Sequence, residues 1–467
     1  MKFVSTRGRA PTLDFSGAVL AGLARDGGLY VPESWPTFTA DEIAALAGRP
    51  YAEVAFAVIA PFVGDAIPAE KLKAMIDEAY AGFHHPAVTP LVQIAPDHFL
   101  LELFHGATIA FKDVAMQLLA RLMDHVLAEK GERATIVGAT SGDTGSAAIE
   151  AFRGRENTDI FILFPEGRVS EVQRRQMTTV ADTNVHAIAV EGTFDDCQAL
   201  VKAMFNHHAF RDRVKLSGVN SINWGRIVAQ VVYYFVAAIA LGAPHRKVSF
   251  TVPTGNFGDI FAGHVARKMG LPIETLVIAT NVNDILVRTL ETGRYETRGV
   301  VATSSPSMDI QVSSNFERLL FEAMGRDGAA VADLMNGLSQ SGAFTIPDAA
   351  LAAIRGEFAA GRCDEETTAA TIARVMAQAG YLLDPHTATG VAVAEDHLGA
   401  APMVTLATAH PAKFPDAVAA ACGIHPALPA RLGDIFARPE RKTMLANDLG
   451  AIETFLLERT RAVSQEV

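Results

Sequence analysis

An alternation of short apolar runs with amphipathic stretches, from residue 134 to about residue 280, constrains the fold more than any other feature. The apolar runs have the length of strands, and the stretches between them have helical spacing of their apolar residues. Strands that are apolar on both faces and separated by helices form parallel sheets covered on both sides. The strands predicted in this way are Ala134–Ala139, Ile160–Phe164, Val185–Val190, Val248–Val252 and Thr275–Ala279. We therefore expect an α/β fold with two such layers.

The rest of the chain divides into regions with different patterns. The first 95 residues read as mostly helical, with helices predicted over Ala40–Leu46, Tyr51–Val63 and Ala69–Gly82, before a proline-rich connector. Further helices are predicted over Asp113–Lys130, Ser146–Phe152, the stretch from the cap Ser170 to Met177, and Asp195–Phe205. From 283 to 400 we expect helices and loops, including a loop at Ser304–Ser307, and then a late strand at Val404–Thr408. The predicted domains are a mostly helical region, 1–95, an α/β core of two subdomains, 96–430, and a helical tail, 431–467.

Composition and charge exclude several classes of function. The chain has 467 residues and a formal net charge of −12, which disfavours nucleic acid or an anionic membrane as partner. Its 3 cysteines are far apart, which argues against a disulfide framework or a thiolate zinc site, and no histidine has metal-ligand spacing, so we expect no metal. The apolar run Ile227–Ala243 contains Gln230 and two tyrosines, which favours a buried helix over a membrane span. The first residues lack the apolar core of a secretory signal, and we expect a cytoplasmic protein.

Three turns follow predicted strands, at the edge where open α/β sheets bind their ligands. They are Thr140–Gly145, Pro253–Asp259 and Thr408–Lys413. In Pro253–Asp259, Gly255 and Gly258 allow a close backbone approach, and the N–H groups of the following helix can hold a phosphate. Thr140–Gly145 is rich in hydroxyl and N–H donors that suit a carboxylate or a second phosphate. On the residues alone, an ordinary strand-to-helix turn explains each of these two segments equally well.

Lys112 is a candidate nucleophile. It follows an apolar stretch and stands at the start of the helix predicted over Asp113–Lys130. A lysine beside a helix N-terminus and apolar walls can have its amine made nucleophilic. Most lysines at such places are simply solvated, and the residues around Lys112 leave both interpretations open.

These segments, in this order, resemble the fold-type-II pyridoxal-phosphate (PLP) enzymes and, among them, the threonine synthase family. The resemblance covers nearly the whole chain, and its most specific parts are the N-terminal motifs and Gly255–Asp259. The matching motifs are Ser5–Gly8, Val19–Glu33, Leu101–Thr108, Ala110–Asp113, Ser141–Gly145, Gly255–Asp259, Asp384–Gly390 and Ala407–Lys413. The fold implied is similar to that of the tryptophan synthase β chain, with two parallel or mixed sheets flanked by helices and a mainly helical N-terminal region.

The resemblance also implies roles for individual residues. Lys112 matches the lysine that holds PLP as a Schiff base and, once released by substrate, moves protons. The PLP phosphate is expected on Gly255, Asn256, Phe257, Gly258 and Asp259, and the pyridine nitrogen on Thr408. The substrate α-carboxylate is expected on Ser141, Gly142, Asp143 and Thr144. Asp143 stands where related dehydratases carry Asn, and Asp is what the longer threonine synthases carry.

The implied substrate is O-phospho-L-homoserine, from which phosphate leaves Cγ before water adds at Cβ to give threonine. The substrate phosphate needs its own anion site, for which Ser221, Asn223, Arg226 and Lys413 are the candidates. His105, His386 and His410 lie inside matching motifs, either as structural residues or as proton carriers. A monomer and a homodimer both fit.

Three rival functions are compatible with parts of this pattern. A serine/threonine dehydratase would lack the N-terminal motifs and carry a run of glycines in place of Gly255–Asp259. A phospho-lyase that degrades a phosphorylated amino acid would keep the cofactor residues and change those around the substrate. A non-catalytic protein of the same fold would lose Lys112, which is present here.

Overall fold

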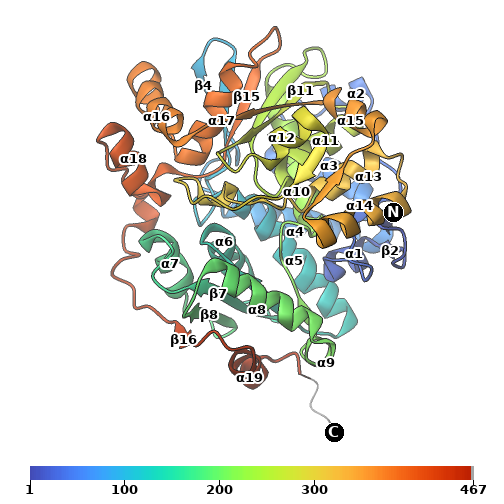
Figure 1. Cartoon of the computed structure of the whole chain (residues 1–467), viewed down its shortest axis with the longest axis vertical. Helices are drawn as coiled ribbons and strands as arrows, with labels where there is room; N and C mark the ends of the chain where they lie inside the picture. The colour runs from blue at the N-terminus through green and yellow to red at the C-terminus, as the bar shows by residue number, and fades with distance from the viewer. Residues whose placement is uncertain (464–467) are drawn as a thin grey trace.

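The computed structural model, which describes residues 1–463, contains a large and a small sheet of the expected kind (Figure 1). The large sheet has the order β14-β11-β10-β15-β5-β4, and all its neighbouring strands are parallel except the β4–β5 hairpin. Its strands are β4 (Leu91–Ala95), β5 (His98–Glu102), β10 (Val248–Pro253), β11 (Ile273–Thr280), β14 (Phe358–Arg362) and β15 (Met403–Ala407). The expectation of two α/β layers is confirmed.

The small sheet is parallel throughout and has the order β16-β8-β7-β6-β9. Its strands are β6 (Ala134–Ala139), β7 (Thr158–Pro165), β8 (Val185–Val190), β9 (Leu216–Ser217) and β16 (Thr443–Leu445). Every residue of β7 is buried, as its apolar sequence predicts for a central strand covered on both faces. The covering helices are α6 (Asp143–Phe152), α7 (Glu171–Thr178), α8 (Phe194–Asn206), α9 (His208–Arg213) and α19 (Leu449–Arg459).

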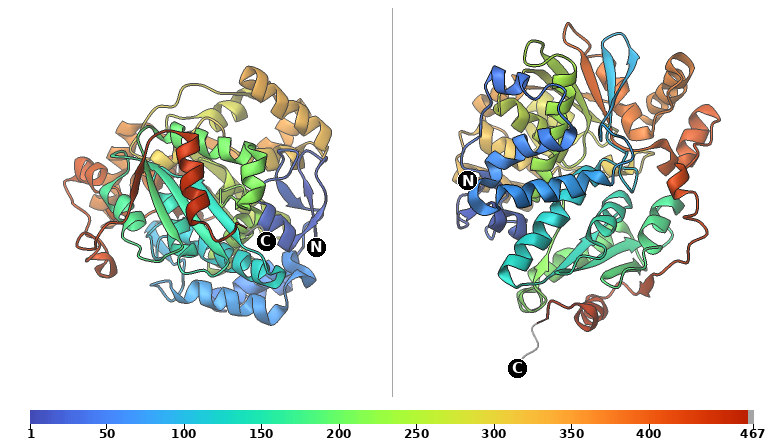
Figure 2. Two further views of the ribbon diagram at one scale, coloured as in Figure 1. Left: turned by 90° about the horizontal axis from the view of Figure 1, so that it is seen from below. Right: turned by 180° about the vertical axis from the view of Figure 1, so that it is seen from behind.

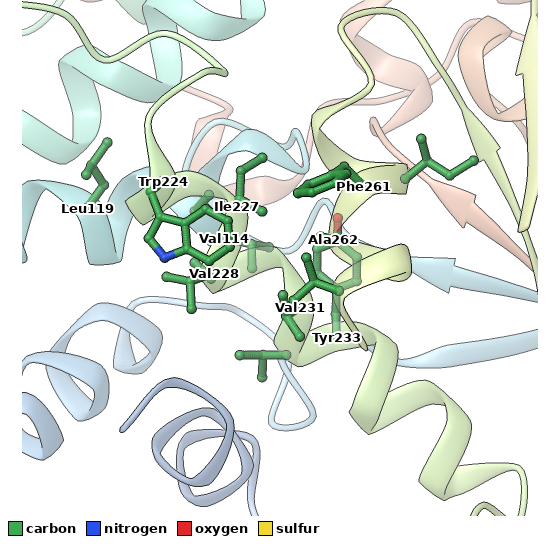
Figure 3. Packing of buried hydrophobic residues seen from close by; sticks show 14 of the residues in the cluster. Val114, Leu119, Trp224, Ile227, Val228, Val231, Tyr233, Phe261 and Ala262 are labelled. Carbon is green, nitrogen blue, oxygen red and sulfur yellow. The ribbon is translucent and has the colours of Figure 1, made fainter. Parts of the chain in front are cut away.

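The helix α10 (Trp224–Ala240) forms the centre of the main hydrophobic core. It packs against α3 (Tyr51–Val63), α5 (Lys112–Lys130) and α11 (Gly258–Lys268). Figure 3 shows Trp224, Ile227 and Val231 of α10 among side chains of α5 and α11. The prediction of a buried helix over Ile227–Ala243 is therefore confirmed, although the helix begins and ends three residues earlier. Among residues 1–463, no helix is long and apolar enough to cross a membrane.

Helices and loops complete the large-sheet side of the molecule. A separate two-stranded antiparallel sheet lies among them, formed by β12 (Arg294–Glu296) and β13 (Ala343–Thr345). The helices are α12 (Ile285–Thr292), α13 (Phe316–Ala323), α14 (Gly328–Ser341), α15 (Asp348–Arg355), α16 (Glu365–Ala379), α17 (Pro385–Glu395) and α18 (Pro415–Cys422). The expectation of helices and loops alone between 283 and 400 was wrong, because β12, β13 and β14 lie there.

The N-terminal region combines the expected helices with an unexpected sheet. Besides α3, it contains α1 (Phe15–Ala21), α2 (Ala40–Ala44) and α4 (Ala69–Ala81), and a sheet of β1 (Lys2–Ser5), β2 (Leu13–Asp14) and β3 (Tyr30–Pro32). The buried Arg318 ties this sheet to the core, since it donates to the carbonyls of Tyr30 and Ile222. The predicted boundary at residue 95 falls just after β4, which belongs to the large sheet, so the connector expected there is partly a strand.

The C-terminal segment crosses from one sheet to the other. It leaves α18 beside the large sheet, runs along the molecule and ends with β16 and α19 on the small sheet (Figures 1 and 2). β16 pairs with β8, and Ile452, Phe455 and Leu456 of α19 join the small-sheet core around Phe161. The predicted tail, 431–467, is thus helical only in part, and its last residues, 464–467, lie outside the described part of the chain.

Truncation of Leu456 tests whether α19 is an integral part of the small-sheet core. Leu456 is fully buried, so Leu456→Ala leaves a cavity and should lower the free energy of unfolding by about 2–5 kcal/mol. Urea unfolding monitored by circular dichroism measures the change. The control Glu458→Ala alters an exposed side chain of the same helix and should shift the transition little. Equal transitions for the two variants would mean that α19 does not contribute to this core.

Candidate active site

The three predicted turns meet around the start of α5. The segment before Lys112 runs antiparallel to the residues after β15, with a bridge between Ala110 and Ala409. The N–H of Phe111 donates to the carbonyl of Thr408 over 2.8 Å, and the N–H of His410 donates to that of Ile109 over 3.1 Å. These bonds fix the first turn of α5 against the carboxyl end of the large sheet. The lysine is thereby held at the edge where ligands of such sheets bind.

The loop from Gly255 to Gly258 presents free backbone donors. Its carbonyls are engaged, since Gly255 accepts from Ser313 Oγ over 2.7 Å and Asn256 accepts from Asn315 Nδ2 over 3.0 Å. Its N–H groups, in contrast, find no acceptor within residues 1–463. Phe257 is in the left-handed region with φ 63°, which turns the chain into α11. Four unpaired N–H groups at a helix N-terminus suit a phosphate, so the donor set fits the one expected for the cofactor.

Gly255 itself has no room for a side chain. A Cβ at this position would lie 2.6 Å from the carbonyl oxygen of Ser307, which belongs to the segment that covers the loop. The close approach explains why a glycine is required here rather than at a neighbouring position.

A buried charge cluster surrounds the amine of Lys112. Asp143, the first residue of α6, has one carboxylate oxygen 3.5 Å from Lys112 Nζ and the other 2.8 Å from Lys413 Nζ. All three side chains are buried. Burial alone would raise the pKa of Asp143, but the neighbouring Lys413, with a smaller effect from Lys112, holds that pKa well below its usual value. Asp143 is therefore a carboxylate at neutral pH.

The amine of Lys112 is less basic than that of an ordinary lysine. Burial lowers its pKa below the usual range, and the positive charges of Lys413 and Arg226 add to the lowering, whereas Asp143 opposes it. A lysine with a lowered pKa is a better nucleophile and proton carrier near neutral pH, because more of it is uncharged.

Ser307 is a site residue that the sequence did not single out. Its hydroxyl accepts from Lys112 Nζ over 3.3 Å and donates to Asp143 over 3.3 Å. Its N–H donates to His386 Nε2 over 3.2 Å, and His386 Nδ1 lies 2.8 Å from Asp384. His386 thus orients the covering loop and does not contact Lys112. The predicted loop at Ser304–Ser307 was the available signal, but the contacts span 195 residues of sequence.

The turn after β6 forms a second donor-rich loop. The hydroxyl of Thr140 accepts from the N–H groups of Gly142 and Gly145, both over 2.9 Å. The backbone N–H groups of Ser141, Asp143 and Thr144 have no acceptor within residues 1–463. This arrangement suits a carboxylate ligand. Gln173 of α7 crosses the loop and donates to Asp143 over 2.9 Å.

The four candidates for a second anion site differ sharply in their surroundings. Arg226 is buried, its Nη1 makes only a 3.4 Å bond to the carbonyl of Val219, and its Nε has no partner within residues 1–463. Burial lowers its pKa to about 10, which still leaves it charged. Ser221 lies before the start of α10, and its carbonyl accepts from Asn315 Nδ2 over 3.3 Å. A buried guanidinium with free donors is a site for an anion.

The side chains of Asn223 and Lys413 make hydrogen bonds within the protein. Asn223 caps α10 by accepting from Gly225 N over 2.9 Å and donates to the carbonyl of Val19 over 2.8 Å. Lys413 is fully buried and donates to Asp143, Thr108 and Gln176. The expectation that Lys413 binds the substrate phosphate conflicts with these bonds, because each of its three N–H groups has an acceptor. One of the two amide N–H groups of Asn223 has no acceptor within residues 1–463, so Asn223 remains a candidate.

The remaining predicted residues take different positions. Thr408 is buried and its hydroxyl makes no hydrogen bond within residues 1–463, so it is available to a ligand. Asp259 is the second residue of α11, directly after the loop Gly255–Gly258, and burial raises its pKa to about 7. His410 accepts from Ala412 N and caps the turn that carries Lys413; burial lowers its pKa to about 4, so it is neutral.

His105 belongs to a separate surface pocket. Its Nε2 lies 2.7 Å from Glu102, which also accepts from the hydroxyl of Tyr381 over 2.6 Å. Within residues 1–463, no group of three or more His, Cys, Asp or Glu is placed to hold a metal ion.

Family models and known proteins match this chain over nearly its whole length. The matching models are "Threonine synthase N terminus" over residues 2–80, "Pyridoxal-phosphate dependent enzyme" over 83–408 and "Threonine synthase, C-terminal" over 387–456. Threonine synthase of Pseudomonas aeruginosa is 55% identical over 459 residues, which cover 98% of each chain. Threonine synthase of Saccharomyces cerevisiae is 44% identical and covers 89% of this chain and 88% of its own.

Two solved structures have the same architecture. The PLP-bound threonine synthase from Brucella melitensis superposes with a TM-score of 0.97 at 67% identity, covering 99% of this chain and 100% of its own. Threonine synthase from yeast superposes with a TM-score of 0.93 at 39% identity, covering 98% of each.

Gly142→Ala tests the loop after β6. Gly142 has φ 140°, and a Cβ there would lie 2.3 Å from the side-chain amide of Gln173. The substitution should strain the loop, displace Gln173 from Asp143 and raise the KM of a carboxylate-bearing substrate at least about tenfold. Steady-state kinetics measure the change, with Gly138→Ala in β6 as control, where the nearest atom would be 3.3 Å away. An unchanged KM would show that this loop does not bind the carboxylate.

Proposed function

The chain belongs to the threonine synthase family of PLP-dependent enzymes, and we propose that it converts O-phospho-L-homoserine and water into L-threonine and phosphate. It is a carbon–oxygen lyase that acts on a small-molecule substrate. The observation that carries the proposal is the placement of Lys112, whose amine faces a buried carboxylate between two loops of unpaired N–H donors. That pair of loops provides one site for the phosphate of a cofactor and another for the carboxylate of an amino acid.

The residues present fit PLP. We propose that Lys112 holds it covalently, that Gly255, Asn256, Phe257, Gly258 and Asp259 hold its phosphate through the free N–H groups, and that the Thr408 hydroxyl bonds the ring nitrogen. When bound, PLP supplies the electron sink that stabilises negative charge developing on the substrate. A hydroxyl partner does not hold that nitrogen protonated as a carboxylate would, so Thr408 tunes the electron demand.

Lys112 also moves the protons of the reaction. Its amine is buried and has a lowered pKa, so it can take a proton from the substrate and return it at a neighbouring carbon. The 3.3 Å contact with Ser307 Oγ keeps the amine aimed across the site when it is not bonded to the cofactor. The covering segment around Ser307 limits the access of water to these steps.

The substrate is held at both ends. We propose that Ser141, Gly142, Asp143 and Thr144 bind its α-carboxylate through their backbone, and that Arg226 with Ser221 binds its phosphate. We do not assign the phosphate to Lys413, whose three donors are used within the protein. Asn223 keeps one amide N–H without an acceptor within residues 1–463 and is a further candidate ligand. The buried guanidinium of Arg226 both attracts the phosphate group and stabilises it as it leaves.

We further propose that the enzyme acts in the cytoplasm as a monomer or a homodimer and binds no nucleic acid or membrane. The net charge of −12 supports this proposal, because it repels polyanions. Light scattering after size-exclusion chromatography distinguishes the two assemblies.

The decisive assay measures threonine and free phosphate together. Purified protein with PLP and O-phospho-L-homoserine should yield the two products in equal amounts. L-serine and L-threonine are tested in parallel, with keto acid as the readout. Phosphate with keto acid and no threonine would mean a phospho-lyase, and keto acid from serine or threonine alone would mean a dehydratase.

Lys112→Ala should abolish turnover and the covalent linkage to PLP, because the neighbouring amine, that of Lys413, is held by three internal acceptors. Borohydride reduction followed by peptide mass spectrometry shows whether the cofactor is attached and at which residue. Lys130→Ala, at the exposed far end of the same helix, should keep both. Turnover by Lys112→Ala at the wild-type rate would contradict the role of Lys112.

Arg226→Gln should lower kcat/KM for the phosphorylated substrate by about tenfold to a hundredfold, because a charge-assisted hydrogen bond to phosphate is lost. It should also weaken inhibition by inorganic phosphate, while PLP affinity stays near that of the wild type. Arg226→Lys keeps the charge and should recover part of the loss. Unchanged phosphate inhibition in Arg226→Gln would place the substrate phosphate elsewhere.

A further inference from the structure

Lys413 makes a complete set of bonds inside the protein. It ends the short 3₁₀ helix η3 (Pro411–Lys413) after β15 and is fully buried. Its Nζ lies 2.8 Å from Asp143 Oδ1 and donates to the carbonyl of Thr108 over 2.9 Å and to Gln176 Oε1 over 3.2 Å. A lysine ammonium has three N–H groups, so each has an acceptor. Lys413 is therefore a fixed positive charge with no donor left for a ligand.

The carboxylate of Asp143 divides its two oxygens between two lysines. Oδ1 accepts hydrogen bonds from Lys413 Nζ over 2.8 Å and from Gln173 Nε2 over 2.9 Å. Oδ2 faces Lys112 at 3.5 Å and Ser307 Oγ at 3.3 Å. A buried carboxylate requires a cation close by. The shorter and better-bonded of the two pairs is the one with Lys413, so the charge of Asp143 is balanced without Lys112.

We propose that Lys413 is a positioning residue that acts as the permanent counter-ion of Asp143 and so leaves the amine of Lys112 uncharged. An uncharged amine is what must add to the aldehyde of PLP, with loss of water, and what must accept a proton during turnover. Without Lys413, the nearest cation available to Asp143 would be Lys112 itself, whose amine would then be held as an ammonium. The inference rests on the proposed role of Lys112 and adds a partner that makes this role feasible.

The other charges around Lys112 come from each element packed against it. Arg226 of α10 adds positive charge, and Asp259 in the first turn of α11 is close enough for Lys112 to affect its pKa. His386 of α17 accepts from the backbone N–H of Ser307. Asp113, next to Lys112 in α5, accepts from Thr108 and is turned away. Of the positive groups, Lys413 is the one bonded to Asp143.

The direction of the expected pH effect follows from these contacts. Burial lowers the pKa of Lys112, Lys413 lowers it further, and Asp143 raises it. Removing Lys413 takes away one lowering influence and leaves Asp143 to pair with Lys112, so the pKa of Lys112 rises. Removing the charge of Asp143 has the opposite effect. Lys413 and Asp143 substitutions should therefore move the same titration in opposite directions.

The experiment follows attachment of PLP to the apoenzyme as a function of pH. The rate of covalent linkage is read from the visible absorbance, and borohydride trapping with mass spectrometry confirms Lys112 as the attached residue. For Lys413→Met, the midpoint of the pH–rate profile should move to higher pH by about one unit, which is about a tenfold slower reaction below the midpoint. Lys413→Arg keeps the charge and should keep the midpoint close to that of the wild type.

Two further variants separate charge from packing. Gln176→Leu removes a neutral partner of Lys413, and should lower the melting temperature without moving the midpoint. Asp143→Asn should move the midpoint to lower pH, and it decides the matter if Lys413→Met does not fold. An unmoved midpoint in a folded Lys413→Met, an equal shift in Gln176→Leu, or an unmoved or raised midpoint in Asp143→Asn would each overturn the proposal. Since linkage is measured without substrate, these results are independent of whether threonine is formed.

Discussion

The carboxylate of Asp143 is charged and fully buried, and the arrangement of the site depends on its neutralisation. An isolated buried carboxylate is strongly unfavourable, and leaving one unpaired costs about 3–5 kcal/mol. Its partners come from three parts of the fold: Lys112 from α5, Lys413 from η3, which follows β15 of the large sheet, and Gln173 from α7 beside the small sheet. Because Asp143 itself begins α6, the same ion cluster joins the two sheets at the point where the ligand sites lie.

The helix α7 links this cluster to the surface of the molecule. Its Gln173 and Gln176 reach Asp143 and Lys413, while Arg174 and Thr178 on its other side bind Glu440 over 2.7 Å each. Glu440 belongs to the C-terminal segment that crosses between the sheets. The position of α7 is therefore determined from both sides, by buried polar contacts in the site and by a partly buried ion pair outside it. The C-terminal segment therefore supports, from outside, the helix whose glutamines bond the charge cluster.

The sequence predicted the alternating strands and helices of the fold well, and it predicted only some of the residues that lie together at the candidate site. The strands Ala134–Ala139 and Val185–Val190 and the helix Tyr51–Val63 have the predicted bounds, because continuous apolar runs and helical spacing are local signals. The strands β1, β9 and β16 were missed, since each has four residues or fewer and is stabilised by a partner far away in sequence. Lys112 and the glycine turns, predicted from their motifs, lie together at the carboxyl end of the large sheet.

The role of Lys413 could not be predicted, because it depends on contacts that only the folded chain creates. Gln176 and Thr108 are 237 and 305 residues away from it. From sequence alone, a lysine near a ligand-binding edge is a reasonable phosphate ligand. Its burial and three internal acceptors are what change the interpretation. Ser307 was missed for the same reason, as its loop meets Lys112 only through the fold.

The pairing of Asp143 with Lys413 gives a physical reason for an acid at this position. A side-chain amide at residue 143 could bond a neighbouring group without any counter-ion. An aspartate adds a full negative charge within 3.5 Å of the reactive amine, which by itself would favour the ammonium form and oppose catalysis. The second lysine cancels that effect at Lys112 while it retains a carboxylate acceptor in the site. The acid and its buried counter-ion are thus one functional unit, and neither is explained without the other.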